Sequence, residues 1–327
     1  MRILLVGGAG YIGSSIAYHL IDRGHEPGIF DNFSTGKREA VPAGAFCREG
    51  DCGDSEALAA ALKDFKATAV VQLAASVRVE ESVSNPWKYY FNNTTKSLNV
   101  FQTCAQNGVR DIVFSSTAAV YGEPDTFLID ESVPTVPVNP YGHSKLASEF
   151  MLKDIARVSG MRATILRYFN VAGADPKLRT GLRTDFATHL IKVSAEVAAG
   201  VRPHLSIFGT DYPTKDGTCV RDYIHVMDLA LAHELALLKP GEDGKTRIYN
   251  CGYGSGQSVR DVVTAFTKVL GRPLPVKDMP RRPGDPAALA CNSAKLKREL
   301  GWNPQHASID EIVESALKWE QKLKASR

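Results

Sequence analysis

The stretch Ile3-Leu4-Leu5-Val6-Gly7-Gly8-Ala9-Gly10-Tyr11-Ile12-Gly13 decides the fold of this 327-residue chain. Its four apolar residues predict a short buried strand, and the glycines lead directly into a helix predicted over Ile12–Asp22. Glycines at this spacing permit a tight turn, a close approach of a pyrophosphate to backbone N–H groups, and close packing of helix on strand. The stretch therefore predicts a dinucleotide site in a βαβ unit, with a glycine-rich turn that binds nothing as the alternative.

The rest of the first half repeats this alternation of short β-branched runs and helical stretches. Parallel strands that are buried on both faces read as apolar runs without alternation, and these runs do so. The predicted strands are Ile3–Val6, Pro27–Asp31, Ala45–Glu49, Ala69–Ala74, Asp111–Ser116 and Arg162–Tyr168. The predicted helices between them are Ile12–Asp22, Ser55–Phe65, Tyr89–Gln106 and Tyr141–Val158. The pattern predicts an α/β fold with a doubly wound parallel sheet of the Rossmann type.

The second half of the chain has a different rhythm. The segment from Gly173 to Asp222 is rich in Pro, Gly and charged residues around one helix, predicted over Thr188–Ala199, and one strand, predicted over Leu205–Phe208. A later helix carries apolar residues along one face from Val259 to Leu270. The last helix is predicted to begin with a capping box, Ser308-x-x-Glu311.

These elements divide the chain into two predicted lobes. Residues 1–171 form a dinucleotide-binding domain, to which residues 221–251 return. Residues 172–220 and 252–327 form a smaller, mostly C-terminal substrate-binding lobe. We expect this lobe to cover the carboxyl ends of the parallel strands, where open α/β sheets bind their ligands.

Composition and charge exclude several classes of partner. The chain has 44% hydrophobic and 23% charged residues and a net charge of +3 from scattered Lys and Arg, so neither nucleic acid nor an anionic membrane is expected. No apolar run approaches the ~20 residues that span a bilayer. The six cysteines include no Cys-x-x-Cys pair and no His at metal-ligand spacing. We therefore expect no metal site, no disulfides and a reducing, cytoplasmic setting.

An acidic residue, Asp31, ends the second predicted strand, 18 residues after Gly13. A carboxylate at this position accepts hydrogen bonds from the ribose 2′-hydroxyl and repels a 2′-phosphate, so NAD is favoured over NADP. Asp51, which follows the third predicted strand, could hold the adenine amino group, and an ordinary strand-end cap is the alternative.

The candidate catalytic pair lies on one predicted helix, where Tyr141 and Lys145 are one turn apart. A free tyrosine hydroxyl has a pKa near 10, too high for a base at neutral pH. A nearby lysine ammonium and the positive nicotinamide ring would lower the pKa of the Tyr141 hydroxyl. Thr117, at the end of the fifth predicted strand, offers a hydroxyl to orient a substrate oxygen. The structural alternative is an aromatic ring packed beneath a lysine stem.

Together, the glycine loop, Ser115-Ser116-Thr117 and Tyr141-x-x-x-Lys145 resemble the extended short-chain dehydrogenase/reductase family. Longer strings resemble the UDP-galactose (UDP-glucose) 4-epimerases within it. They are Asp31-Asn32-Phe33-Ser34-Thr35-Gly36, Val120-Tyr121-Gly122, Asn139-Pro140-Tyr141-Gly142, Leu166-Arg167-Tyr168-Phe169-Asn170 and Gly217-Thr218-Cys219-Val220-Arg221-Asp222-Tyr223-Ile224-His225-Val226. The resemblance runs from Met1 to about Trp302.

The resemblance implies a reaction. Tyr141 would remove the proton of the sugar 4-hydroxyl while hydride passes from C4 to NAD, and the 4-keto sugar would turn and take the hydride back on its other face. A loosely held sugar suits this chemistry if the nucleotide supplies the binding energy. Arg221 and Arg282 match family positions on the diphosphate, where a guanidinium pairs with phosphate oxygens. Without the family, a surface ion pair would explain each arginine equally well.

The resemblance also implies the residues of the site. The catalytic residues would be Thr117, Tyr141 and Lys145. The cofactor-binding residues would be Gly7, Gly10, Tyr11, Ile12, Gly13, Asp31, Asn32, Ser34, Thr35, Gly36, Asp51, Cys52, Leu73, Ala74, Ala75, Asn92, Tyr141, Lys145 and Tyr168. The substrate-binding residues would be Thr117, Tyr141, Asn170, His189, Leu190, Ser206, Phe208, Arg221, Tyr223, Arg282, Asp285 and Leu289. A homodimer paired through the helices Tyr89–Gln106 and Tyr141–Val158 is also implied.

Two departures from the family pattern bear on function. Thr117 replaces a serine but keeps the hydroxyl, and Leu289 replaces the large tyrosine of epimerases restricted to UDP-glucose and UDP-galactose. Epimerisation of UDP-N-acetylhexosamines, UDP-glucuronate or UDP-pentoses therefore stays open. A 4,6-dehydratase or decarboxylase would need a carboxylic acid after Thr117, where this chain has Ala118 and Ala119. A non-catalytic NAD sensor would not need both Tyr141 and Lys145.

Overall fold

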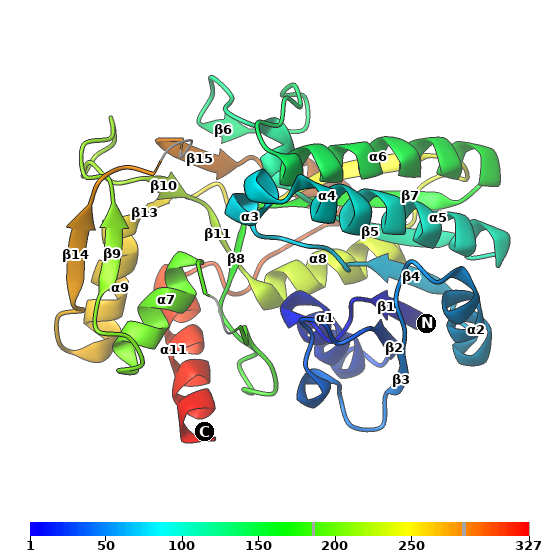
Figure 1. Cartoon of the computed structure of the whole chain (residues 1–327), viewed down its shortest axis with the longest axis horizontal. Helices are drawn as coiled ribbons and strands as arrows, with labels where there is room; N and C mark the ends of the chain where they lie inside the picture. Colours follow the sequence, from blue (N-terminus) through cyan, green and yellow to red (C-terminus); the bar gives the residue numbers. More distant parts are fainter. Residues whose placement is uncertain (185–186, 283–285, 327) are drawn as a thin grey trace.

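The computed structural model describes residues 1–184, 187–282 and 286–326. Its centre is a seven-stranded parallel sheet with helices on both faces, which confirms the predicted doubly wound α/β fold (Figure 1). The strands lie in the order β12 (Thr246–Cys251), β7 (Arg162–Tyr168), β5 (Asp111–Thr117), β4 (Ala69–Gln72), β1 (Arg2–Val6), β2 (Glu26–Asp31) and β3 (Phe46–Glu49). β12 lies outside the predicted strands, because Thr, Arg and Asn interrupt its apolar pattern at the sheet edge.

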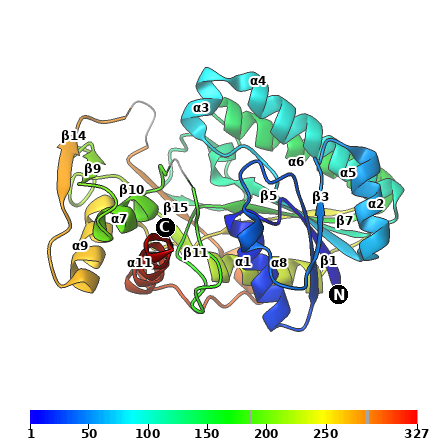
Figure 2. The same ribbon diagram turned by 60° about the horizontal axis from the view of Figure 1, so that its bottom comes forward.

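Two separate apolar cores lie on the two faces of the sheet, because successive strand residues point to opposite sides. The main covering helices are α1 (Tyr11–Asp22), α2 (Ser55–Phe65), α5 (Lys96–Gln106), α6 (Pro140–Ser159) and α8 (Val226–Leu238). Ile3 and Leu5 pack with α1 and α8, whereas Leu4 and Val6 pack with α2, α5 and α6 (Figure 2). None of the described helices is both long and apolar enough to cross a bilayer.

The predicted helix over Tyr89–Gln106 is built of three pieces. A short α4 (Pro86–Tyr89) runs into a π-helical turn, η2 (Tyr90–Thr95), before α5 begins. The predicted helical segment is therefore present, with a π-helical turn in its first half. π-helical turns are rare and often mark functional sites.

The smaller lobe packs three helices around a core of its own: α7 (Leu190–Ala198), α9 (Val259–Leu270) and α11 (Ile309–Ala325). Two parallel strands accompany them, β9 (Leu205–Phe208) and β14 (Val276–Met279). A four-stranded sheet has the order β13 (Gln257–Ser258), β10 (Val220–Arg221), β15 (Ala288–Cys291) and β6 (Leu128–Ile129). The remaining elements are η1 (Arg38–Ala40), α3 (Val79–Ser84), η3 (Ala118–Tyr121), β8 (Asn170–Ala172), β11 (Tyr223–His225) and α10 (Ala294–Leu300).

The position of α10 differs from the predicted division into lobes. Leu296, Leu300 and Trp302 share an apolar core with Ile3 and Leu5 of β1, and α10 packs on β12. This short stretch of the predicted substrate lobe therefore lies with the main sheet. The division of the rest of the chain, with residues 221–251 returning to the sheet through α8 and β12, stays our proposal.

Helix capping also differs from the prediction. Ser308 precedes α11 but makes no side-chain capping bond, and Glu311 instead pairs with His306, whose Nδ1 lies 2.5 Å from its carboxylate. The predicted box is therefore wrong, because the histidine takes the side chain that the box requires. A capping box does form at α9, where Ser258 and Asp261 bind each other's backbone N–H groups.

We predict that Ser258→Ala lowers the free energy of unfolding by about 1 kcal/mol, because the first turn of α9 loses its capping oxygen. Ser308→Ala is the matched control and should change the free energy of unfolding by less than about 0.5 kcal/mol, as for an ordinary surface substitution. Urea unfolding of the three proteins measures both values. Equal losses from the two substitutions would contradict the assignment of the caps.

Candidate active site

The glycine loop between β1 and α1 contains glycines that packing or backbone conformation requires and one, Gly10, that neither requires. Gly7 has φ +83°, and a Cβ there would lie 2.6 Å from the backbone nitrogen of Ala74. A Cβ on Gly13 would lie 2.6 Å from Gly8 Cα. Gly10 has an ordinary φ of −76°, and its Cβ would meet nothing closer than 3.5 Å. Because neither packing nor backbone conformation requires Gly10, the loop fits a pyrophosphate lying against it.

Asp31, predicted to bind the ribose, is held in place at the end of β2 by backbone hydrogen bonds. Its Oδ2 accepts a hydrogen bond from Ala9 N at 2.9 Å, and its Oδ1 accepts one from Phe33 N at 2.8 Å. Burial raises the pKa of the carboxyl, and these two hydrogen bonds oppose the rise. Gly36 closes over it, since a Cβ there would lie 3.0 Å from Oδ1. Each oxygen keeps lone-pair capacity for a ribose hydroxyl.

Asp51, which could hold the adenine amino group, accepts hydrogen bonds from three neighbouring residues. Its Oδ2 accepts hydrogen bonds from Asn32 Nδ2 at 3.0 Å and Lys96 Nζ at 2.7 Å, and its Oδ1 accepts one from Gly53 N at 2.8 Å. Burial raises the pKa of this carboxyl, and the hydrogen bonds lower it by more. The sequence analysis did not predict Lys96 as a site residue, because that prediction requires knowing that α5 passes beside the third strand. Cys52 is buried beside Asp51, while Ser34 and Thr35 are exposed.

The loop after β4 forms the wall opposite Gly7. The backbone nitrogens of Leu73 and Ala74 both donate to the carbonyl oxygen of Val6, at 2.9 and 3.0 Å. Leu73, Ala74 and Ala75 are half-buried here, next to the glycine loop. The structure therefore brings this predicted group close to the predicted pyrophosphate site.

The π-helical turn η2 connects the loop after β4 to α6 through hydrogen bonds. Asn92 Nδ2 donates to Ser76 Oγ at 3.1 Å. Buried Asn93 accepts from Ser76 N at 2.7 Å, and its Nδ2 donates to Ser76 O at 2.9 Å and to Ser144 Oγ at 3.1 Å. The sequence interpretation included Asn92 but not Asn93, Ser76 or Ser144. Two adjacent asparagines inside an otherwise helical stretch were the available signal.

Tyr141 and Thr117 meet where β5 ends and α6 begins. Asn139 caps α6 by accepting from Gly142 N at 2.9 Å. Thr117 Oγ1 accepts from Ala119 N at 3.1 Å, and the Thr117 side chain lies beside the Tyr141 hydroxyl. Burial raises the pKa of Tyr141, and the neighbouring Thr117 side chain opposes the rise. The lowering that Lys145 and a nicotinamide ring together would produce stays a prediction.

Lys145 lies one turn further along α6 and is almost fully buried. Its Nζ donates to the carbonyl oxygen of Ser115 at 2.8 Å and lies 4.9 Å from the centre of the Phe114 ring. Burial lowers its pKa to about 7, and the carboxylate of Glu149 opposes that shift. Of the predicted catalytic pair, Lys145 is therefore buried and Tyr141 half-buried, and burial disfavours the charged form of each side chain.

Several predicted substrate residues lie on the strands of the smaller sheets and the segments beside them. The Arg282 guanidinium lies 3.8 Å from the centre of the Phe208 ring, and Arg221 Nη1 donates to the carbonyl oxygens of Val220 and Pro286. Asn170 of β8 pairs with Tyr223 of β11.

Leu289 lies opposite Arg221 in the β10–β15 pairing and packs against the cluster that includes Ala118 and Phe169. It is half-buried, as are Leu190 at the start of α7 and Ser206 on β9, whereas His189 is exposed. Asp285 lies outside the described residues.

The hydroxyl groups of two predicted cofactor residues point elsewhere. The Tyr11 hydroxyl donates to Gly173 O at 2.6 Å, and the Tyr168 hydroxyl lies 2.5 Å from His233 Nε2. Burial lowers the pKa of His233 to about 4, so its ring is neutral and Nε2 accepts a hydrogen bond from the Tyr168 hydroxyl. Tyr11, like Ile12, would contact a dinucleotide through its backbone at the start of α1, while the Tyr168 hydroxyl is committed to the core.

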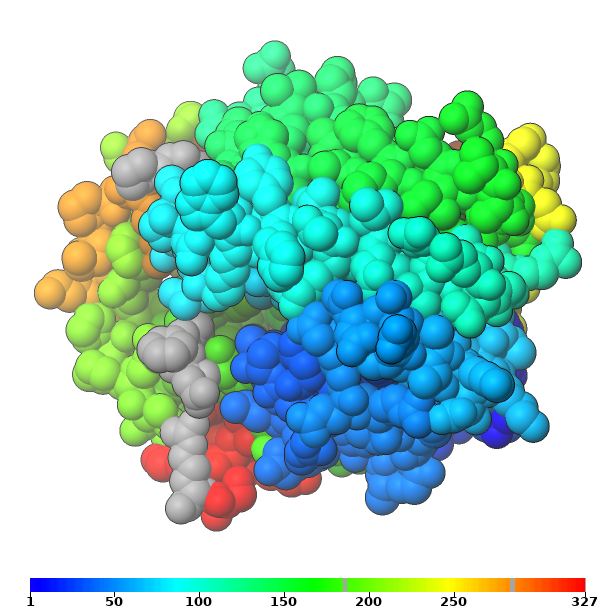
Figure 3. All heavy atoms as spheres, turned by 45° about the vertical axis from the view of Figure 1, so that its right-hand side comes forward, coloured from blue at the N-terminus to red at the C-terminus, as the bar shows by residue number. Residues whose placement is uncertain are grey.

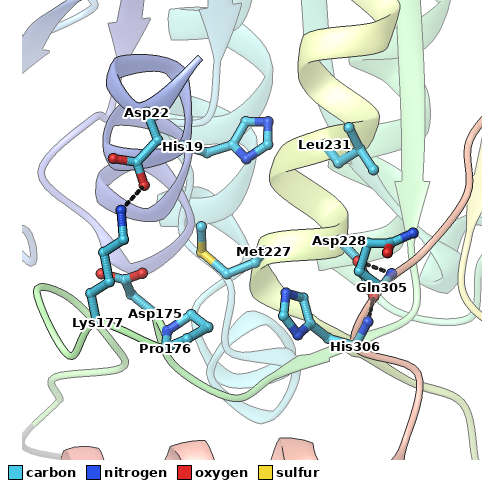
Figure 4. A pocket seen from close by; sticks show the side chains of 10 residues that line it. All are labelled: His19, Asp22, Asp175, Pro176, Lys177, Met227, Asp228, Leu231, Gln305 and His306. Atoms are coloured by element: carbon cyan, nitrogen blue, oxygen red, sulfur yellow. Dashed lines mark hydrogen bonds and ion pairs between the residues drawn. The ribbon is translucent and has the colours of Figure 1, made fainter. Parts of the chain in front are cut away.

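A separate hollow of about 220 Å³ lies between α1 and α8 (Figure 4). None of the predicted site residues lines it. Its Asp22 is paired with Lys177 at 2.9 Å, and Asp228 accepts from the backbone nitrogens of Gln305 and His306. Among the described residues, no three His, Cys, Asp or Glu side chains group as metal ligands.

Comparisons with known proteins show which proteins this chain is similar to. Residues 3–252 match the NAD-dependent epimerase/dehydratase family. A UDP-glucose 4-epimerase of Azospirillum brasilense is 51% identical over 99% of this chain and 93% of its own length. The crystal structure of UDP-glucose 4-epimerase from Brucella ovis in complex with NAD is 40% identical, with a TM-score of 0.93 and 98% of each chain covered. The UDP-Glc/GlcNAc 4-epimerase of Campylobacter jejuni is 45% identical, with a TM-score of 0.85, over 98% of this chain and 99% of its own.

We predict that Gly10→Ala folds normally but loses its dinucleotide. The added methyl group has room inside the protein, whereas a clash with the ligand of ~1.4 kcal/mol already lowers affinity tenfold. Dinucleotide released from the denatured protein, measured per chain, should fall by about tenfold or more. Gly13→Ala is the contrasting control and should lower stability itself, because its methyl group meets backbone atoms at 2.6 Å. Full dinucleotide content in Gly10→Ala would contradict the placement.

Proposed function

The chain belongs to the NAD-dependent epimerase/dehydratase family, and we propose that it inverts C4 of a UDP-hexose, interconverting UDP-glucose and UDP-galactose. The observation that carries the proposal is the placement of Tyr141 beside Thr117 and one helical turn from Lys145 at the carboxyl end of the sheet. The names of the similar proteins support this activity.

Each residue of the proposed site has its own role in the reaction. NAD, when bound, supplies a hydride acceptor for C4 and returns the hydride. Tyr141 takes the proton of the 4-hydroxyl and gives it back, while Thr117 orients the same oxygen. Lys145 supplies positive charge that favours the phenolate form of Tyr141. Ala118 and Ala119 offer no acid beside Thr117, which disfavours an elimination.

The nucleotide serves as the anchor. Because the hydride returns to the other face of C4, the sugar has to turn within the site, and it can do so only if it is held loosely. Arg221 and Arg282 would bind the diphosphate, with Arg282 fixed against the Phe208 ring. The remaining predicted cofactor and substrate residues keep the roles that the resemblance implies.

The activity can be tested on the purified protein with UDP-galactose, UDP-N-acetylgalactosamine and UDP-glucuronate offered separately. Chromatographic separation of the products should show UDP-glucose formed from UDP-galactose without added NAD, since each cycle regenerates the cofactor. A dehydratase would give a 4-keto-6-deoxy product instead, and an NAD sensor would leave all three compounds unchanged.

We also propose that the chain forms a homodimer through α5 and α6. Large apolar side chains are exposed along α3, α4, η2, α5 and α6, and exposed apolar surface of this kind is typical of protein interfaces. They are Val83, Trp87, Phe91, Leu98, Phe150 and Val158, with exposed fractions of 38–83%. Figure 3 shows the surfaces of the cyan segment and of the green α6 side by side on one face.

A cytoplasmic setting is part of the proposal. All six cysteines are free, and five of them are buried. Burial raises the pKa of Cys52 to about 11, so its thiol is inert. Unpaired thiols inside the core suit a reducing compartment.

We predict that Tyr141→Phe lowers kcat by about 10²-fold or more, the usual contribution of a general base. The substitution removes one hydroxyl and little volume, so the unfolding curve and the bound NAD should stay unchanged. Tyr18→Phe removes a hydroxyl elsewhere on the chain and is the matched control. Activity in Tyr141→Phe within tenfold of the unmodified protein would rule out Tyr141 as the base.

We predict that the chain also interconverts UDP-N-acetylglucosamine and UDP-N-acetylgalactosamine, because Leu289 is shorter than a tyrosine and half-exposed on β15. Leu289→Tyr should lower kcat/KM for the acetylated pair by about tenfold or more and spare the unmodified pair. Leu128→Tyr, on the neighbouring strand β6, is the control. An unchanged preference in Leu289→Tyr, or no turnover of acetylated sugars by the unmodified chain, would show that Leu289 is not the gate.

We predict that Phe150→Glu yields a monomer, because a charge in the centre of an apolar interface cannot be solvated there. Analytical ultracentrifugation measures the mass of each variant. Phe127→Glu, which changes an exposed phenylalanine outside α5 and α6, should stay dimeric. A dimeric Phe150→Glu would place the interface elsewhere.

A further inference from the structure

Glu149 lies one turn beyond Lys145 on α6 and is fully buried. Its Oε1 accepts from Ser116 Oγ at 2.5 Å and from Arg167 Nε at 2.9 Å, and its Oε2 accepts from Arg167 Nη2 at 2.6 Å. Arg167 is itself only 3% exposed. The carboxylate and the guanidinium therefore form a bidentate pair inside the protein, directly beneath the catalytic pair.

The pair is the centre of a longer buried network. Arg167 Nη1 donates to the Tyr121 hydroxyl at 2.8 Å, and the guanidinium carbon lies 4.9 Å from the centre of the Tyr121 ring. The Tyr121 hydroxyl donates to Asn250 Oδ1 at 2.8 Å. Glu149 of α6 is thus connected to β7, η3 and β12, so its position is fixed on several sides.

The contact of Glu149 with Ser116 is one of three contacts between α6 and the end of β5. Three consecutive residues at the end of β5 contact three residues of α6 that are each one turn apart. Thr117 and Ser115 hold the catalytic pair, as described above, and Ser116 holds Glu149. A shift of α6 along β5 would break all three contacts at once, and Glu149 is the deepest of the three anchors.

The charge of Glu149 also reaches the catalytic pair. Its carboxylate opposes the effect of burial on the pKa of Lys145, and Arg167 balances it from the far side. Stability alone gives little reason for such a pair, since well-packed apolar residues often replace a buried ion pair without loss. The other titratable groups near Tyr141 are Tyr89, with Glu81, on α4 and α3, and Tyr168 on β7. Beyond Arg167 lie Tyr121 on η3, Cys251 on β12 and the carboxylate of Glu131, which accepts from Asn250 N at 2.7 Å.

We propose that Glu149 is a positioning residue of the reaction: it fixes α6 in register on β5 and, paired with Arg167, keeps the net charge beside Tyr141 and Lys145 at zero. The role rests on the proposed function, in which Tyr141 acts as an anion and Lys145 as a cation. The substitution Glu149→Gln keeps the shape of the side chain and leaves Arg167 as an unbalanced positive charge, because an arginine cannot lose its proton in a protein.

The direction of the effect on pH dependence follows from the sign of that charge. An extra positive charge stabilises the Tyr141 phenolate and destabilises the Lys145 ammonium, so both groups lose their protons at lower pH. Both limbs of the kcat–pH profile should therefore move to lower pH in Glu149→Gln, each by about one unit. The double variant Glu149→Gln/Arg167→Met removes both charges and should return the limbs to their original positions, although kcat stays lower.

The test measures kcat against pH for the unmodified chain, Glu149→Gln and the double variant, with circular dichroism to confirm folding. An ultraviolet titration of the Tyr141 phenolate, with Tyr141→Phe as the blank, repeats the measurement without substrate. This second readout does not depend on the reaction, so its failure and a failure of the proposed function are distinguishable. A purely structural role predicts a lower kcat with unmoved limbs in both variants, and that result would overturn the proposal.

Ser116→Ala tests the register separately, because it removes one hydroxyl and leaves the ion pair in place. We expect kcat to fall by about tenfold with both pH limbs unmoved, as for a small misplacement of reacting groups. This variant keeps the proposal testable if Glu149→Gln does not fold. An unchanged kcat in Ser116→Ala would show that Glu149 does not need β5 to hold the helix.

Discussion

The contact between α6 and the end of β5 is the constraint on which the site depends. Gly142, in the first turn of α6, packs so closely that a Cβ would lie 2.6 Å from the carbonyl oxygen of Ala119. Asn139 caps the same turn. Hydroxyl and carbonyl groups of β5 then bind successive turns of the helix. Because a displacement of about 1 Å can cost a reaction two orders of magnitude, an anchored helix is a better carrier of the base than a loop.

The same helix is linked to the dinucleotide side through η2. Asn92 and Asn93 both reach Ser76, and Asn93 also reaches Ser144 on α6. In a regular α-helix, adjacent side chains point about 100° apart, so two neighbours rarely meet the same residue. The π-helical turn allows this convergence. It joins the loop beside the glycine turn to the helix that carries Tyr141, and so fixes the proposed hydride acceptor relative to the proposed base.

The sequence predicts the parts of the molecule that short-range chemistry encodes. The glycine loop, Asp31, the six apolar strands and the Tyr141–Lys145 helix all follow from local patterns, and the fold prediction is confirmed. The strand β12 escapes prediction because polar residues interrupt its apolar pattern. Its place in the sheet is set by pairing with β7, a contact that is distant in the sequence. Lys96 and Glu149 escape for the same reason: each is an ordinary helical residue until the fold brings Asp51 or Arg167 beside it.

The wrong capping box shows the same limit at short range. Ser308-x-x-Glu311 has the required pattern, but the partner of Glu311 is His306, which the pattern does not consider. The pKa of Tyr141 shows a related limit, because burial raises it and no local sequence pattern reports burial. Local patterns name the residues that can interact, and the long-range packing selects among them.

Burial of the catalytic pair has a cost that the proposed reaction can tolerate. Taking Tyr141 and Lys145 out of water disfavours the charged form of each, and a base that exchanged protons with solvent in every cycle would be poorly placed there. An epimerisation returns both the proton and the hydride to the sugar, so no net proton has to cross the protein. The proton can stay within the site for the whole cycle, and the dry surroundings strengthen the interactions that hold the transient charges. The buried partners of α6 therefore suit a reaction that begins and ends with the same atoms in place.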